Sequence, residues 1–129
     1  MVVKKRTKRK SYGGEHALQK SFFEWLNLVY PKVRKVSFAV PNGVRCSPAQ
    51  GAKLKAEGLT AGIPDAFIGF PSNGYHGLFI EFKFGKNIVS VLQEEKIKAL
   101  TANGYLCDVC YTIDEAMDLV NQYVKCSTI

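Results

Sequence analysis

The chain has 129 residues, a hydrophobic content of 47% and a formal net charge of +7. This length suits one domain with a single core. No apolar run approaches the roughly 18 to 20 residues of a membrane span, and the charged N-terminus lacks the apolar core of a signal peptide. We therefore expect a soluble, intracellular, cytoplasmic protein, with a bacterial or phage-infected cell as the setting, and exclude a membrane-spanning one.

The positive charge is concentrated at the N-terminus. Removing the six basic residues of the first ten positions leaves 12 basic residues against 11 acidic ones. These six residues are Lys4, Lys5, Arg6, Lys8, Arg9 and Lys10. Such a block is often a disordered arm that binds nucleic acid, although a solubilising tail or a targeting remnant has the same composition. We predict a flexible basic arm over residues 1–12 and a single domain over residues 13–129.

The first elements after the arm are a helix and a strand. Apolar residues recur at helical spacing over residues 18–29, and Pro31 is expected to stop this helix. Residues 36–40, with the sequence VSFAV, are typical of a short strand that the turn at 41–43 closes.

A second helix and a hairpin follow. Ser47 is placed as an N-cap, Gln50 stands at the capping-box position, and Gly58 is expected to end the helix. Residues 65–70 and 77–84 are typical of two strands joined by a short polar turn, which predicts an antiparallel hairpin.

The last third of the chain predicts helix, strand, helix. Ser90 opens a helix that Gly104 terminates, and residues 105–111 form a further strand. Thr112 and Glu115 form a capping box before the last helical stripe. The predicted order is α-β-α-β-β-α-β-α, an α/β fold.

The four cysteines raise the possibility of a zinc site. They are Cys46, Cys107, Cys110 and Cys126. In a strand, positions three apart point to opposite faces, so the pair Cys107 and Cys110 is a weak signal for a shared ion. No second Cys or His pair stands at zinc-ligand spacing. We therefore interpret the cysteines as reduced, small core hydrophobes.

Two opposite charges interrupt the apolar strand at 77–84. Alternation places Phe79, Glu81 and Lys83 on one face. A same-face salt bridge is the simplest interpretation. The hairpin, however, also brings Asp65 close to Glu81, and two adjacent carboxylates repel each other unless a cation lies between them. A hard ion such as Mg²⁺, which keeps several waters, fits such a pair.

These residues resemble a known family. Pro64-Asp65, followed after fifteen residues by Glu81-Phe82-Lys83, is similar to the PD-(D/E)XK nuclease signature. The resemblance extends over about residues 15–124 to the virus-type replication-repair nuclease (VRR-NUC) domain, in its free-standing form. It rests on an ordered set of motifs: Glu15 and Gln19 in the first helix, PNG at 41–43, GIPD at 62–65, LFIEFK at 78–83, SVLQ at 90–93 and NGY at 103–105.

The resemblance implies a restriction-endonuclease-like fold, with a central mixed sheet flanked by helices, and a metal-dependent DNA endonuclease. It implies that Asp65, Glu81 and the backbone carbonyl of Phe82 bind Mg²⁺ or Mn²⁺. Lys83 would then orient or deprotonate the attacking water and offset charge in the transition state.

Three further residues have simple structural alternatives. Glu15 is either an acidic residue in a first helical turn, favoured by the helix dipole, or a water-mediated or second-metal ligand. Gln93 is either the capping partner of Ser90 or a member of the site, and Lys86 either contacts a phosphate or is solvated. With these residues, the expected catalytic set is Asp65, Glu81, Lys83, Glu15 and Gln93.

The expected function is that of a Holliday-junction-resolvase-like homodimer that acts on branched DNA in replication, recombination or repair. A flap or general DNA nuclease of the same fold is the alternative, as is a catalytically idle nucleic-acid-binding module.

Overall fold

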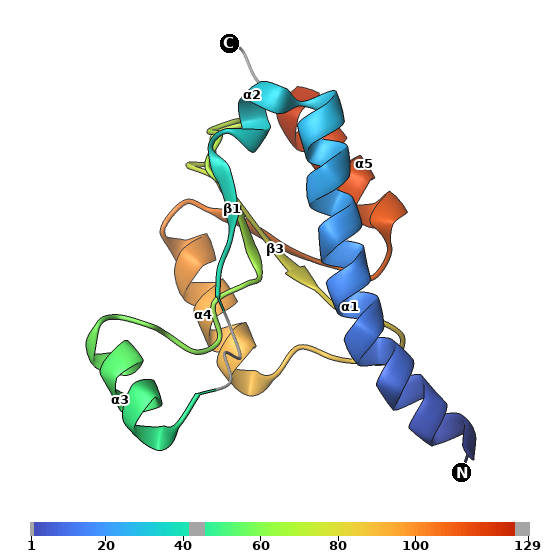
Figure 1. Ribbon diagram of the computed structural model, residues 1–129. Helices are drawn as coiled ribbons and strands as arrows, with labels where there is room; N and C mark the ends of the chain where they lie inside the picture. The colour runs from blue at the N-terminus through green and yellow to red at the C-terminus, as the bar shows by residue number, and fades with distance from the viewer. Residues whose placement is uncertain (1, 42–45, 126–129) are drawn as a thin grey trace.

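The computed structural model describes residues 2–41 and 46–125, with side chains described from Gly14 onward. Nine elements follow one another along the chain (Figure 1). They are α1 (Val2–Val29), α2 (Pro31–Arg34), β1 (Ser37–Ala39), α3 (Pro48–Ala56), β2 (Ala66–Ile68), β3 (Leu78–Phe82), α4 (Val91–Ala102), β4 (Leu106–Cys110) and α5 (Ile113–Lys125).

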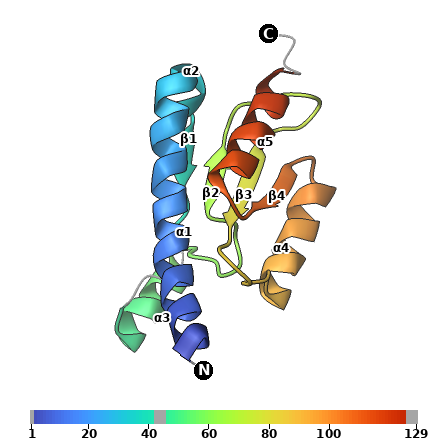
Figure 2. The same cartoon turned by 90° about the vertical axis from the view of Figure 1, so that its right-hand side faces the viewer.

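The four strands form one mixed sheet in the order β1-β2-β3-β4. The pairs β1–β2 and β2–β3 are antiparallel, whereas β4 runs parallel to β3. Figure 2 shows the strands side by side, with α5 in front of them and with α1 and α4 on opposite sides. The parallel pair follows from the connection, because α4 carries the chain back before β4 begins.

The core lies between the sheet and the helices α1 and α5, which also pack against each other. Leu78, Ile80 and Phe82 alternate along β3 and are fully buried on this side. The ring of Phe22 from α1 lies 5.4 Å from that of Phe82. The described helices include none that is long and apolar enough to cross a membrane.

The predicted hairpin is confirmed, since β2 and β3 pair with Ala66 opposite Ile80 and Phe67 opposite Phe79. The predicted capping box of α3 is also present. The Oγ of Ser47 accepts from the backbone N–H of Gln50, and the side-chain oxygen of Gln50 accepts from the backbone N–H of Ser47.

Other parts of the prediction differ from the structure. The first helix begins at Val2, so it runs through the segment expected to be a flexible arm; Lys and Arg are good helix formers. Pro31 does not simply stop the helical pattern, because it is the first residue of α2, where its missing N–H costs nothing. Before α5, half of the predicted capping box is present, since Thr112 Oγ1 accepts from the backbone N–H of Glu115. The other half differs, because the Glu115 side chain accepts from the backbone N–H of Tyr111 instead of that of Thr112.

The cysteines follow the prediction in part. Cys110 is buried in the core and Cys107 is half-buried on the other face of β4, as the alternation requires. Cys46 is exposed, so its interpretation as a core residue was wrong. The turn predicted at 41–43 and Cys126 lie at least partly outside the described residues.

Candidate active site

The hairpin brings two carboxylates together at one end of the sheet. Extending the β2–β3 register by one residue places Asp65 opposite Glu81. Asp65 is fixed by its side chain, because its Oδ2 accepts a hydrogen bond of 2.9 Å from the backbone N–H of Phe82. Its own backbone carbonyl accepts from Val40 N–H, which connects the start of β2 to the end of β1.

Glu81 is buried at 3% exposure, although it is a charged residue in a strand. Its Oε2 accepts from Gln93 Nε2 at 3.0 Å and lies 3.4 Å from Lys83 Nζ. Its Oε1 is also buried, but it has no hydrogen-bond partner among the described residues. A buried carboxylate oxygen without a partner is costly, so this atom is the feature of the site that most needs explanation.

Burial raises the pKa of both carboxyl groups, Asp65 and Glu81. Desolvation raises the pKa of Glu81 from its ordinary value of 4.5 to about 7, and the charge of Asp65 adds to the rise. The pKa of Asp65 is raised as well, again chiefly by burial. The positive charge of Lys83 lowers the pKa of both carboxyl groups. A bound cation would relieve the desolvation and the repulsion together.

The donor set fits a hard, oxygen-preferring ion. The pair offers a partnerless carboxylate oxygen on Glu81 beside the carboxylate of Asp65, and both groups bind such an ion in their deprotonated form. The described residues include no cluster of three or more His, Cys, Asp or Glu side chains that could hold a metal. Two carboxylates completed by backbone oxygen and water suit Mg²⁺ or Mn²⁺, whereas structural zinc needs four N or S ligands. The role of the Phe82 carbonyl stays a prediction.

Glu15 approaches this site from α1. Its Oε2 accepts a hydrogen bond of 2.5 Å from Asn87 Nδ2, and its charge raises the pKa of both Asp65 and Glu81. The neighbouring Gly14 makes this approach possible, because a side chain there would collide with the ring of Phe84. A glycine inside a helix costs about 1 kcal/mol relative to alanine. Here it allows α1 to lie close to the chain that follows β3.

Asn87 was missed by the sequence analysis. Its side chain binds Glu15, and its backbone carbonyl accepts from Tyr111 Oη at 2.9 Å. The three residues come from α1, from the loop after β3 and from the end of β4. No local pattern connects segments that lie so far apart in sequence, so only the fold reveals this contact.

Gln93 has both of the contacts that the sequence left as alternatives. Its Oε1 accepts from Ser90 N–H at 2.9 Å, as a capping box requires, and its Nε2 binds Glu81. Lys86 is exposed and has no described contact with the site. The side chains of the basic segment at residues 4–10 lie outside those that the structure describes.

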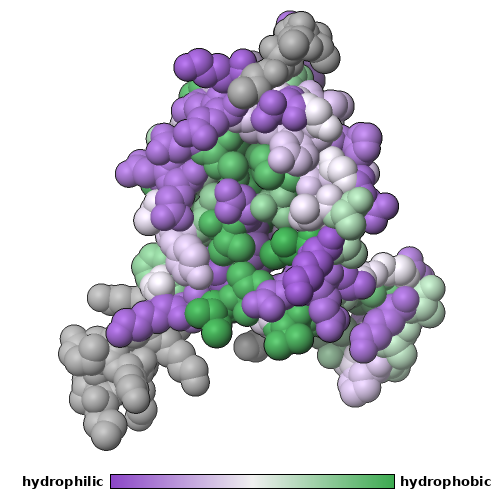
Figure 3. All heavy atoms as spheres, turned by 180° about the vertical axis from the view of Figure 1, so that it is seen from behind, coloured by the Kyte–Doolittle hydropathy of each residue, from purple (hydrophilic) through white to green (hydrophobic). Residues whose placement is uncertain are grey.

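Apolar surface borders the site. Seen from behind, apolar atoms gather at the lower middle of the molecule, where the loop after β3 leads into α4 (Figure 3). Ile88, Val91 and Leu92 of this stretch are 79%, 73% and 44% exposed.

Comparisons with known proteins show which family the chain belongs to. The sequence profile of the VRR-NUC domain matches residues 14–113. The chain belongs to the VRR-NUC family. A solved structure described as a VRR_NUC domain protein is similar with a TM-score of 0.76 and 29% identity, over 88% of this chain and 89% of the other. A search of curated proteins gave no match.

Membership confirms the fold class predicted from the sequence, a mixed sheet with flanking helices. It also identifies the chain as a member of a nuclease family, with DNA as the implied substrate. All five residues predicted to be catalytic lie within the matched range.

The carboxylates of the VRR-NUC site give metal-free stability a distinctive pH dependence. The pKa of Glu81 is raised from its ordinary value of 4.5 to about 7 in the folded protein, so the folded protein binds this proton more tightly than the unfolded chain. The free energy of unfolding therefore falls as the pH rises from 4.5 through about 7. For Glu81 we expect a loss of roughly 2 kcal/mol by pH 8. Denaturant unfolding with EDTA should show this loss in the wild type but much less of it in Glu81→Gln.

Mg²⁺ should reverse that trend. The cation competes with protons for the carboxylates, so it should raise the melting temperature at pH 8 far more than at pH 5. An equal increase at both pH values would contradict binding at this pair.

Proposed function

We propose that this VRR-NUC domain is a Mg²⁺-dependent, structure-selective DNA endonuclease that acts as a Holliday-junction-resolvase-like homodimer. The observation that carries the proposal is the partnerless Glu81 Oε1 beside Asp65 and Lys83. A structural ion pair explains Lys83 and Oε2. It does not explain a second, half-buried carboxylate beside Glu81 or the oxygen left without a partner.

Asp65 and Glu81 would hold the cation, and both are oriented before it binds. The Phe82 N–H orients Asp65, and Gln93 orients Glu81. The bound cation supplies a Lewis acid for the phosphodiester and lowers the pKa of water. The buried setting strengthens every charge interaction in the site, because less water screens it.

Lys83 would act directly on the reacting groups. Its side chain is only 12% exposed, and its Nζ lies on the same side of β3 as Glu81. From there, as a cation, it can orient the attacking water and offset charge on the phosphoryl oxygens; only as a neutral amine could it accept a proton from that water. Glu15, held by Asn87, would act at the edge of the site through water.

A four-way junction presents two equivalent strands, whereas the described residues of this chain contain a single pair of site carboxylates, Asp65 and Glu81. Symmetric cleavage therefore requires two copies, and a two-fold axis is the commonest arrangement of such oligomers. The near-neutral body of the chain keeps repulsion between subunits small. These points favour a homodimer over the flap-nuclease alternative.

The direct test incubates the purified protein with labelled four-way junction, flap, duplex and single-stranded DNA, in Mg²⁺, Mn²⁺ or EDTA. We expect paired nicks placed symmetrically across the junction, in either metal but not in EDTA. Preferred flap cutting would support the alternative nuclease. DNA binding without cleavage of any substrate would instead indicate an idle binding module.

The basic N-terminal segment is expected to contribute to affinity rather than to chemistry. Deleting residues 1–10 removes six positive charges and should weaken DNA binding and flatten its salt dependence, because fewer counterions are released. The cleavage rate at saturating DNA should change by less than about threefold. Binding titrations at several salt concentrations measure this, and an unchanged salt slope would show that the segment does not touch DNA.

A further inference from the structure

A series of hydrogen bonds leads from α5 to α1 beside the candidate site. Glu115, in the first turn of α5, accepts from the backbone N–H of Tyr111 at 2.7 Å. The hydroxyl of Tyr111 donates to the backbone carbonyl of Asn87 at 2.9 Å, and the side-chain amide of Asn87 donates to Glu15 Oε2 at 2.5 Å. We call the last three residues the Tyr111–Asn87–Glu15 link.

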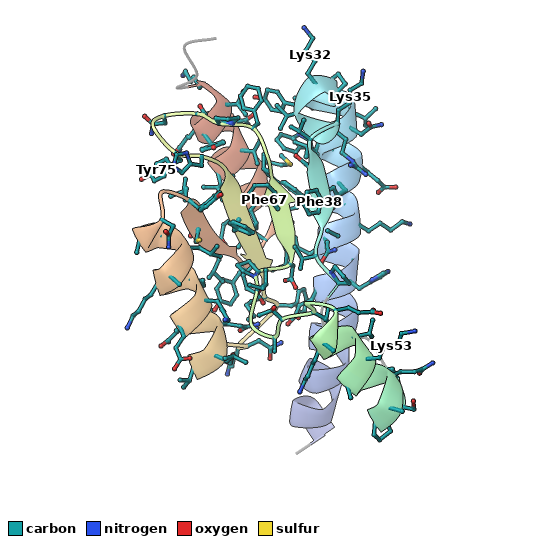
Figure 4. All side chains as sticks on the ribbon, turned by 90° about the vertical axis from the view of Figure 1, so that its left-hand side faces the viewer. Lys32, Lys35, Phe38, Lys53, Phe67 and Tyr75 are labelled. Carbon is teal, nitrogen blue, oxygen red and sulfur yellow. The ribbon has the colours of Figure 1, made fainter. Side chains whose placement is uncertain are left out.

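Glu15 lies at the edge of the well-packed part of α1. Among the described side chains of this helix, the buried core residues are Leu18, Phe22 and Leu26, which all follow Glu15 in the chain. Figure 4 shows the N-terminal half of α1 extending beyond the end of the strands, and Figures 1 and 2 agree. The sheet therefore supports the helix on the C-terminal side of Glu15 only.

A cavity also separates this part of α1 from the start of α5. Its volume is about 340 Å³, and its lining includes Leu18 and Ser21 from α1 and Tyr111 and Ile113 from the other side. Packing between the two helices is thus incomplete beside Glu15. A glutamate side chain has several rotamers, so a side chain in such a place needs a specific partner to keep one of them.

We propose that Asn87 and Tyr111 are positioning residues for the cation site. Asn87 holds the carboxylate of Glu15 in one orientation, and Tyr111 holds the loop that carries Asn87. The inference rests on the proposed function, because it gives Glu15 its place beside the Asp65–Glu81 pair.

Glu15 is close enough to act on that pair. Burial is the main cause of the raised pKa of Asp65 and Glu81, and the negative charge of Glu15 raises both values further. The described residues include no group of three acidic, His or Cys side chains that could hold an ion directly, so Glu15 would act through a water molecule. Outer groups of this kind orient the ligands of a metal and strengthen its binding.

The alternative is a link that only joins two helices, and Tyr30 offers the comparison. The hydroxyl of Tyr30 donates to Asn121 Oδ1 of α5 at 2.6 Å, just after the C-terminal end of α1. Tyr30→Phe and Tyr111→Phe therefore each remove one hydroxyl that connects these parts of the fold. A purely structural role would make the two variants alike, whereas a positioning role affects the cation site in Tyr111→Phe alone.

The first measurement is Mn²⁺ binding to the DNA-free protein, followed by electron paramagnetic resonance. Glu15→Ala and Asn87→Ala should each raise the dissociation constant for Mn²⁺ about 10-fold, and Tyr111→Phe about threefold. In a Glu15→Ala background, Asn87→Ala and Tyr111→Phe should have no further effect, because both act through Glu15. Tyr30→Phe should bind Mn²⁺ as the wild type does.

The second measurement is single-turnover cleavage at saturating DNA. Asn87→Ala and Tyr111→Phe should lower the saturated rate by about 10-fold and threefold, with DNA affinity unchanged. Neither change should lower the rate further in Glu15→Ala. If circular dichroism shows that Asn87→Ala is unfolded, Tyr111→Phe, which loses a single oxygen atom, carries the test.

Three results would overturn the inference while leaving the proposed function in place. They are wild-type Mn²⁺ affinity in the folded link variants, an equal loss in Tyr30→Phe, and losses that add fully to that of Glu15→Ala. Weaker Mn²⁺ binding in the link variants of a protein that cleaves no DNA would support the inference and contradict the proposed function. A wild type that binds no Mn²⁺ would overturn both.

Discussion

Asp65→Asn and Glu81→Gln are each expected to lower the rate of DNA cleavage by at least about 10³-fold. Each substitution removes one of the two negative charges that would hold the cation. Glu81 is the more sensitive position. In Glu81→Gln the atom that replaces the partnerless Oε1 would be either an amide nitrogen or an uncharged amide oxygen, and neither would attract the cation as a carboxylate oxygen does. Single-turnover cleavage of a labelled junction in Mg²⁺ measures the loss.

Both variants should keep the fold. Removing one of the two charges relieves the repulsion that Asp65 exerts on the buried Glu81, so the metal-free stability at pH 8 should be equal to that of the wild type or higher. The Phe82 N–H can still donate to the side-chain oxygen of Asn at position 65. Wild-type activity in either folded variant would contradict the assignment of the site.

Lys83→Ala should lower the cleavage rate by about 10²–10⁴-fold, the range of a positioned proton-transfer group. The loss should appear in the rate at saturating DNA rather than in DNA affinity, because one buried ammonium contributes little to binding a polyanion. Lys86→Ala is the matched control, since Lys86 is an exposed lysine three residues away. It should change affinity slightly and the saturated rate by less than about threefold.

Lys83→Arg separates the two roles proposed for this residue. Arginine keeps the positive charge but cannot give up its proton at accessible pH. Substantial activity in this variant would assign Lys83 to charge stabilisation alone, whereas loss as deep as in Lys83→Ala would favour proton transfer. Equal saturated rates for Lys83→Ala and the wild type would remove Lys83 from the mechanism.

The sequence predicted the site pair because its determinants are local. Two short strands joined by a turn can form an antiparallel hairpin, and alternation then decides which side chains share a face. Those two rules are sufficient to bring Asp65 close to Glu81, as the register shows. The capping boxes at Ser47 and Ser90 were equally accessible, because each depends on residues three apart.

The features that were not predicted depend on contacts distant in sequence. The contact of Gly14 with Phe84, and the link from Glu15 through Asn87 to Tyr111, arise only when α1 packs against the end of β3. Nor could periodicity show that Phe38, Phe67 and Phe79 lie in a row across three strands, since a half-buried strand has the same alternation whether or not a helix covers it.

The central claim is that Asp65 and Glu81 together hold a divalent cation. The most direct measurement is the anomalous diffraction signal of Mn²⁺ in crystals of the wild-type protein, with Glu81→Gln crystals as the comparison. The account predicts a wild-type peak bound by both carboxylates, with Oε1 of Glu81 as a ligand, and a weakened or absent peak in the variant. No peak at this pair in a protein that cleaves DNA with Mn²⁺, or the same peak in Glu81→Gln, would contradict it.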